Sequence, residues 1–170
     1  MKALALPLLI ASGLLFAQAK TDYALNAGQV HFHVPPDWTA IMEKADGDPQ
    51  AVIFQVPDPT AQGTEETASV TVKTRSLKSS ADFQGFLTDE FERAKGQGGY
   101  EADGSSKDAQ AHHYFVTRNK TRYQVRDAYQ LSGNVAVAVR CQRPLLDGTP
   151  KEWSDTFDAG CSTVVSSLKH

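Results

Sequence analysis

The chain has 170 residues, among them 17 basic and 20 acidic side chains, 12 glycines, 8 prolines and 2 cysteines. This composition excludes collagen-like, low-complexity and disulfide-dense proteins and is typical of one ordinary globular domain. The formal net charge of −3 argues against a nucleic-acid-binding protein, because such domains are usually basic.

The first 19 residues have the features of a secretory signal peptide. An apolar run over residues 3–17 follows the initial Met-Lys, and Ala17-Gln18-Ala19 is a small-residue cleavage site. An uncleaved membrane anchor is the alternative, but a bilayer core requires about 20 apolar residues, and this run has about 15 with Pro7 among them. We therefore expect cleavage after Ala19, a periplasmic or secreted single domain over residues 20–170, and no membrane span in the mature chain.

The first strand predicted in the mature chain covers residues 29–34. Its side chains alternate between an apolar face and a face with two histidines: Val30, Phe32 and Val34 against His31 and His33. Pro35-Pro36 ends the strand, because proline cannot donate a hydrogen bond to a sheet. Trp38, just beyond, is expected to close the core.

Two more strands are predicted over residues 51–56 and 68–77. The first is apolar on both faces apart from Gln55, and a proline-rich acidic loop over residues 57–67 separates the two strands. The second strand alternates between an apolar face and a polar one: Val70 and Val72 against Thr71, Lys73 and Arg75.

An amphipathic helix is predicted next, because the spacing of the apolar side chains changes from two residues to about 3.6. Its apolar stripe consists of Phe83, Phe86, Leu87, Phe91 and Ala94. Ser79 and Asp82 have the spacing of a capping box, in which each side chain accepts a backbone N–H at the start of a helix. The segment over residues 95–110 is rich in glycine and serine and is expected to be a mobile connection.

Three β-type runs follow over residues 112–117, 122–131 and 135–142, with connections short enough for hairpin turns. Residues 145–150 are expected to form a turn. The final element, over residues 151–168, has apolar side chains at helical spacing, although Gly160 is expected to interrupt it.

Cys141 and Cys161 are the only cysteines, and an exported protein meets an oxidising environment. Cys141 lies on the apolar face of the last predicted strand, and Cys161 lies on the apolar stripe of the helix that follows. Packing this helix on the sheet buries both stripes and brings the sulfurs together. We therefore predict a Cys141–Cys161 disulfide, with two buried free thiols as the alternative.

The short motifs that accompany catalysis and cofactor binding are absent from the sequence. The chain has no His-Glu-x-x-His zinc helix, no Gly-x-Ser-x-Gly elbow, no Cys-x-x-Cys pair and no Gly-x4-Gly-Lys-Ser/Thr phosphate loop. We expect no cofactor and no enzymatic activity. A hydrolase whose site is assembled from dispersed residues stays an alternative.

A second alternative is a metal-binding protein that uses His31 and His33 as ligands. Two positions apart on a strand, their side chains lie on one face about 7 Å apart and could chelate a borderline metal with a third ligand from another strand. No spacing in the sequence identifies that third ligand. A pair of polar surface histidines is therefore the favoured interpretation.

Charge is unevenly distributed, with acidic residues in the early loops and basic residues later in the chain. Arg118, Lys120, Arg122 and Arg126 lie close together in a stretch whose only acidic residue is Asp127. These four residues could form a docking surface for an anionic partner. A solvated sheet face is the favoured interpretation, because antiparallel sheets commonly present charged side chains to water.

The order of the elements and the segment Val30-His31-Phe32-His33-Val34-Pro35-Pro36-Asp37-Trp38 resemble the PsbP-like fold. That family includes photosystem II extrinsic proteins, DcrB-like periplasmic proteins and a nuclear-import factor. The resemblance implies an α+β domain in which helices flank both faces of an antiparallel sheet, and a binding or assembly role. We therefore expect an exported, non-catalytic accessory domain whose partner is a protein or an anionic ligand.

Overall fold

The computed structural model describes residues 20–62, 64–105 and 107–168, so the predicted signal peptide lies outside the described residues. These described residues form nine strands and two α-helices, and a short 3-10 turn over Ser80–Asp82 leads into the first helix. In chain order they are β1 (Thr21–Leu25), β2 (Val30–Val34), β3 (Thr39–Lys44), β4 (Gln50–Val56), β5 (Ala68–Ser76), α1 (Phe83–Lys95), β6 (Glu101–Ala102), β7 (Ala111–Arg118), β8 (Thr121–Ser132), β9 (Val135–Pro144) and α2 (Lys151–Ser167).

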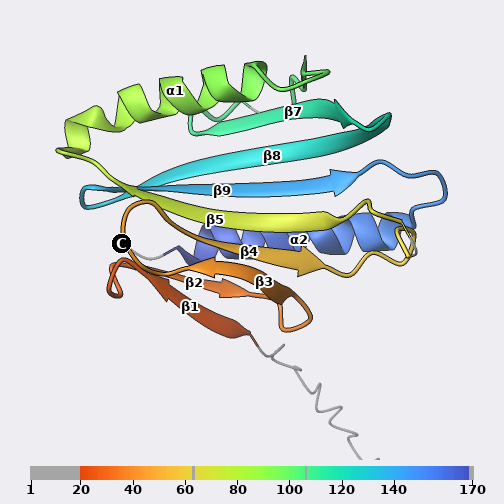
Figure 1. Cartoon of the computed structure of the whole chain (residues 1–170), viewed down its shortest axis with the longest axis horizontal. Coiled ribbons are helices and arrows are strands. Elements are labelled where there is room, and N and C mark those ends of the chain that lie inside the picture. Colours follow the sequence, from red (N-terminus) through yellow and green to blue (C-terminus); the bar gives the residue numbers. More distant parts are fainter. Residues whose placement is uncertain (1–19, 63, 106, 169–170) are drawn as a thin grey trace, which may run out of the picture.

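Seven of the strands form one antiparallel sheet in the order β3-β4-β5-β9-β8-β7-β6, and β1 and β2 form a separate hairpin. The helix α2 and the β1–β2 hairpin pack on one face of the large sheet, and α1 packs on the other (Figure 1). The predicted α+β class, with an antiparallel sheet flanked by helices, is confirmed.

The main core lies between the large sheet and the layer formed by α2 and the hairpin. Strand alternation supplies the sheet side of this core, and the apolar stripe of α2 supplies the helix side. Its best-buried members include Phe32, Phe54, Val70, Val72, Val137, Val139, Phe157 and Val164. A smaller core lies under α1, where Phe86 and Leu87 pack on Tyr129 and Ala136.

Three short strands, β1, β3 and β6, were not predicted from the sequence. Five of the six residues of β3 are exposed, so its sequence TAIMEK lacks the alternation that marks a half-buried strand. The connection over residues 95–110, expected to be mobile, contains β6, which pairs with Tyr114 and Phe115 of β7. The backbone N–H of Asp103 also donates to the carbonyl of His113 at 3.0 Å. The expectation of a mobile connection was therefore wrong for the part that forms β6 and continues to Asp103.

Gly160 does not interrupt α2, which contradicts the expectation from helix propensity. Trp38 packs directly against this position: a Cβ atom on Gly160 would lie 2.5 Å from Cζ2 of the Trp38 ring. The absence of a side chain lets the indole approach the helix backbone, where it also packs near Phe157. Packing against Trp38 therefore explains a glycine that propensity alone disfavours in a helix.

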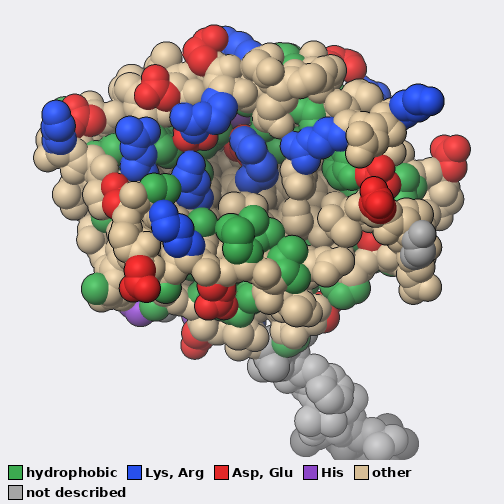
Figure 2. Space-filling view, in the orientation of Figure 1, with side chains coloured by type: hydrophobic (Ala, Val, Ile, Leu, Met, Phe, Trp, Pro, Cys, Tyr) green, Lys and Arg blue, Asp and Glu red, His purple; other side chains and the backbone are tan. Residues whose placement is uncertain are grey.

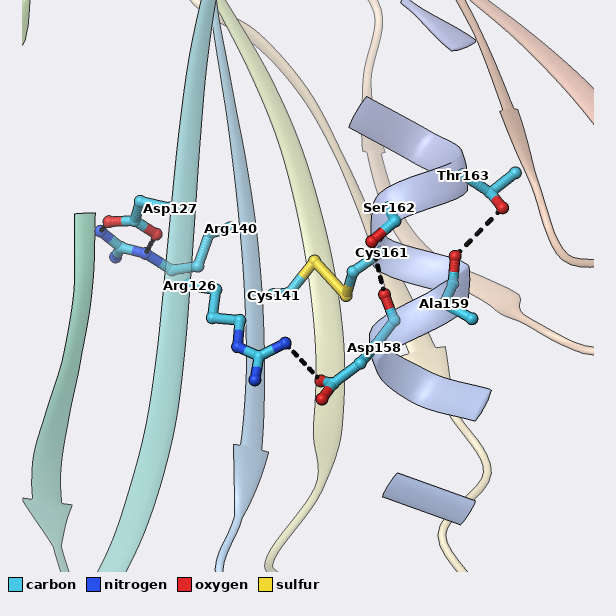
Figure 3. The surroundings of a disulfide bond; sticks show 9 residues. All are labelled: Arg126, Asp127, Arg140, Cys141, Asp158, Ala159, Cys161, Ser162 and Thr163. Atoms are coloured by element: carbon cyan, nitrogen blue, oxygen red, sulfur yellow. Dashed lines mark hydrogen bonds and ion pairs between the residues drawn. A yellow bond between two sulfur atoms is a disulfide. The ribbon is translucent and has the colours of Figure 1, made fainter. Parts of the chain in front are cut away.

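The predicted disulfide is confirmed. Cys141 of β9 and Cys161 of α2 are bonded, with their Cα atoms 6.2 Å apart. Figure 3 shows the bond crossing from the sheet to the helix, next to the ion pair between Arg126 and Asp158. The disulfide fixes α2 on the sheet face opposite α1.

Candidate functional site

One face of the large sheet is open over β3, β4 and β5. The helix α1 packs over β7, β8 and β9 on this face, and no described helix lies in front of the other three strands (Figure 1). Because Val70 and Val72 of β5 face the main core, the side chains between them point to the open face. The polar side chains that β5 presents there are Ser69, Thr71, Lys73 and Arg75.

Basic side chains form a band across this open face. Figure 2 shows the band, with a group of hydrophobic side chains beside it over β4 and β3. The strand register places Lys44 and Lys73 in one cross-strand row, on either side of Ala51. Arg140 of β9 lies opposite Thr71, diagonal to Lys73. The small Ala51 side chain between Lys44 and Lys73 leaves their charged ends free to project.

Three of these cations lack an acidic partner within the part of the chain that the structure describes. Lys44, Lys73 and Arg75 form no ion pair with any described residue. Among the acidic side chains near these cations, Glu90 of α1 and Asp127 of β8 are buried and paired with Arg93 and Arg140. Asp82 and Asp89 are exposed and line a hollow together with Arg75. Lys44 and Lys73 therefore place positive charge on the open face of a chain whose net charge is negative.

A hollow of about 150 Å³ lies where the band meets α1. It is lined by Thr71, Lys73, Glu90, Arg93, Asp127, Tyr129, Ala138 and Arg140. Since Arg93 and Arg140 are engaged by acidic side chains, Lys73 is the lining cation that is left for an external anion.

Asp127 anchors a buried hydrogen-bond network behind the hollow. Its side chain is only 2 % exposed, and Arg140 donates two hydrogen bonds to it, each 2.8 Å long. The hydroxyl groups of Tyr114 and Tyr129 each donate a further bond at 3.1 Å. Figure 3 shows Asp127 and Arg140 on the side of the sheet away from the disulfide. With four donors already bound, the carboxylate is a structural acceptor that holds Arg140 in place.

Burial and the Asp127 charge control protonation in this network. Burial raises the pKa of Tyr114 and Tyr129 well above the usual range, and the Asp127 charge adds to the effect. Burial alone would lower the pKa of Arg140, but hydrogen bonds and attraction from Asp127 outweigh it and raise the pKa. Both tyrosines therefore stay neutral donors and Arg140 stays charged at physiological pH.

His112 lies at the edge of the same network, and its protonation is expected to make the stability of the fold depend on pH. Its ring packs on Phe91 and Tyr114, and its Nε2 lies 2.9 Å from the Tyr100 hydroxyl. Burial lowers the pKa of His112 from its ordinary value of about 6.5, helped by the charges of Lys95, His113 and Arg140 and opposed by Asp127.

The folded state therefore favours neutral His112, whereas the unfolded chain binds a proton once the pH falls below about 6.5. This contribution to stability is full above that pH and is lost as the pH falls toward the lower folded pKa. We expect the decrease in Tm between about pH 7.5 and about pH 5 to be smaller in His112→Gln than in the wild type. Differential scanning calorimetry at both pH values measures it, and an equal decrease in the two proteins would contradict the assignment.

The basic residues that the sequence suggested as one docking surface do not lie together. Arg118 is on the α1 face, where it donates to Gln97 and Gln142, whereas Arg122 is on the opposite face and pairs with Glu101 at 2.8 Å. Lys120 is in the turn between β7 and β8.

Arg126 corrects the expectation of a solvated sheet face. Its guanidinium lies 2.9 Å from Asp158 of α2, and its side chain is only 34 % exposed. The helix covers this part of the face because the disulfide and the apolar stripe of α2 hold it there. A strand pattern identifies the face that a charged residue occupies, but not the helix that later covers it.

His31 and His33 lie on the outer face of β2, as the alternation predicted. The β1–β2 pairing brings Asp22 opposite His33, and the carboxylate contacts Nδ1 of that ring. In residues 20–62, 64–105 and 107–168, no group of three or more His, Cys, Asp or Glu side chains is placed to hold a metal ion. The metal-binding alternative thus gains no third ligand from this part of the chain.

The sequence did not predict that the open face would gather cations from different strands. It placed Lys73 and Arg75 on the polar side of a strand, but Arg140 becomes their neighbour only because β5 pairs with β9, far along the chain. The one available signal was Asp127, an acidic residue at a position where the strand pattern requires an apolar side chain. Such a residue marks a buried polar network.

No protein-family model matches the chain, and no curated protein matches it either. Among solved structures, the chain is similar to LpqN of Mycobacterium tuberculosis, described as involved in cell envelope biogenesis. The identity is 13 %, the match covers 89 % of this chain and 90 % of LpqN, and the TM-score is 0.55. At 13 % identity, this structural likeness shows the fold alone.

A Bacteroides thetaiotaomicron protein of known structure also matches, with 13 % identity over 89 % of this chain and a TM-score of 0.49. The match covers 48 % of that protein, so this chain spans about half its length. Among the described residues of the present chain, no helix is both long and apolar enough to cross a membrane.

Proposed function

We propose that this chain is an exported, non-catalytic binding domain that docks on an anionic partner through its open sheet face. The observation that carries the proposal is a set of three cations, Lys44, Lys73 and Arg75, that form no ion pair with any described residue and lie on one face of a chain with net charge −3. Complementary charge steers association and selects partners. This surface replaces the hairpin residues Arg118 to Arg126 as the candidate for partner binding.

The chemistry of the face favours binding over catalysis. Asp127 and Glu90, the acidic side chains in the hollow, are buried and engaged by Arg140 and Arg93, so neither is a free base or nucleophile. The raised pKa of Tyr129 disfavours a tyrosinate there. Fixed cations and neutral donors are suited to holding an anion.

Export is supported by three features. The first 19 residues have a signal-peptide pattern with a predicted cut after Ala19, and the Cys141–Cys161 disulfide is typical of an oxidising compartment. LpqN, which shares the fold, is described as a protein of cell envelope biogenesis. The resemblance to PsbP-like proteins also agrees with a binding or assembly role.

The proposal is tested by chromatography of the exported, purified protein on immobilised dextran sulfate. We expect the wild type to be retained at low salt and released as the salt concentration rises, because screening weakens charge contacts. Lys73→Glu/Arg75→Glu should elute without retention. The control Lys107→Glu/Lys120→Glu changes the net charge equally at exposed loop and turn positions and should elute like the wild type.

Thermal unfolding of each variant checks that it is folded. If Lys73→Glu, which is half-buried, lowers stability, then Lys44→Glu/Arg75→Glu replaces it, because both of those positions are exposed. A wild type that is not retained, or equal elution of the two charge-reversed pairs, would overturn the proposal.

A further inference from the structure

We infer that the anionic partner is the surface of a lipid bilayer with anionic headgroups, an inference that rests on the proposed function. The cations explain attraction to any polyanion. The additional observation is a pair of exposed aliphatic side chains beside them, Ile41 at 58 % and Met42 at 47 % exposure. Figure 2 shows hydrophobic side chains adjoining the basic band on this face.

The position of these side chains follows from an irregularity in β3. The register shifts between Ala40 and Met42, so that Ile41 is the extra residue of a bulge. Met42 lies opposite Ile53, which is also directed to the open face. The edge strand of the sheet therefore presents a small apolar surface, with Lys44 two residues further along the same strand.

This combination fits a bilayer better than a soluble polymer. Aliphatic side chains enter the boundary between headgroups and acyl chains, where they are removed from water, but they gain nothing from a hydrated polyanion. Lysine and arginine have long apolar stems, so their charged ends reach headgroup phosphates while neighbouring apolar groups insert. The open face offers both kinds of contact at once.

A second copy of the chain does not account for the same features. A symmetric dimer through this face would place the unpaired Lys44 and Lys73 of one subunit near those of the other, because an isologous interface is self-complementary. Like charges brought together in this way oppose association. An anionic surface instead neutralises them and covers Ile41 and Met42.

The test measures cosedimentation of the exported protein with vesicles. One set contains equal parts phosphatidylglycerol and phosphatidylcholine, and the other contains phosphatidylcholine alone. We expect binding to the anionic vesicles only, decreasing with salt, because each basic residue near an anionic surface increases partitioning by about five-fold. Lys73→Glu/Arg75→Glu should therefore bind the anionic vesicles at least about ten-fold more weakly.

A second variant separates a bilayer from other polyanions. Ile41→Ser/Met42→Ser removes exposed side chains and keeps every cation, so it should bind anionic vesicles about five-fold to ten-fold more weakly and keep wild-type retention on dextran sulfate. Leu145→Ser is the matched control, because Leu145 is 37 % exposed and lies outside this face, in the connection to α2. It should bind vesicles like the wild type.

The outcomes distinguish the two proposals. Retention on dextran sulfate without vesicle binding would overturn the bilayer inference and leave the anionic docking function in place, with a soluble polymer as partner. Equal vesicle binding by Ile41→Ser/Met42→Ser and the wild type would also overturn it. Loss of both vesicle binding and dextran sulfate retention in the wild type would overturn both proposals.

Discussion

Replacing Asp127 with alanine should lower the free energy of unfolding by about 3–5 kcal/mol, the range observed when one partner of a buried ion pair is removed. The carboxylate is 2 % exposed and accepts four hydrogen bonds. Its loss leaves the Arg140 charge without a counter-ion and the hydroxyl groups of Tyr114 and Tyr129 without an acceptor. Urea unfolding followed by circular dichroism measures the change.

Two further variants test whether the loss comes from the stranded charge. Arg140→Ala in the Asp127→Ala background removes that charge, so the double variant should lose much less than the sum of the two single losses. Asp89→Ala removes an exposed carboxylate of α1 and should change the free energy of unfolding by no more than about 0.5 kcal/mol. Strict additivity of the Asp127 and Arg140 effects would show that the pair is not coupled.

The network also has a consequence for the open face. Arg140 lines the hollow together with Lys73, and Asp127 fixes its guanidinium from behind. A docking surface whose cations are already positioned loses less side-chain entropy on binding. In the proposed binding role, the buried carboxylate would act through Arg140, whose guanidinium it holds in place.

Local sequence patterns predicted most of the fold, because in the main elements the spacing of the apolar residues shows which side chains are buried. The alternation of Val135, Val137 and Val139 identified β9, and the spacing of Phe157, Cys161 and Val164 identified α2. Those two patterns together gave the disulfide, since each cysteine lies on a buried face. β3 was not predicted because it is an exposed edge strand, so its sequence does not alternate between apolar and polar side chains.

The candidate site was harder to predict, because it depends on contacts distant in sequence. Lys73 lies opposite Ala138, 65 residues away along the chain, through the pairing of β5 with β9. The alternation of side chains within a single strand does not show which distant strand will pair with it. The basic residues of the β7–β8 hairpin appeared as one group in the sequence, but alternation and the coverage by α2 separate Arg118 from Arg126.

Removing the Cys141–Cys161 disulfide should lower the free energy of unfolding by about 3 kcal/mol in the loop-entropy model, because the bond closes a loop of 20 residues. In a domain of this size, that loss corresponds to a decrease in Tm of roughly 6–12 °C. The cysteines are 3 % and 6 % exposed, so Cys141→Ala/Cys161→Ala adds a small loss of packing.

Urea unfolding with and without reductant separates the cross-link from the packing. Oxidised wild type should unfold at the highest urea concentration, and reduced wild type should approach the double variant, whose midpoint should not respond to reductant. The folded double variant should keep its retention on dextran sulfate, because the disulfide lies on the sheet face opposite the cationic band. An unfolding midpoint of the wild type that reductant leaves unchanged would show that the bond contributes no stability. The helix α2 would then be held by its apolar stripe, by the Arg126–Asp158 ion pair and by hydrogen bonds to other elements at Trp153, Val165 and Ser167.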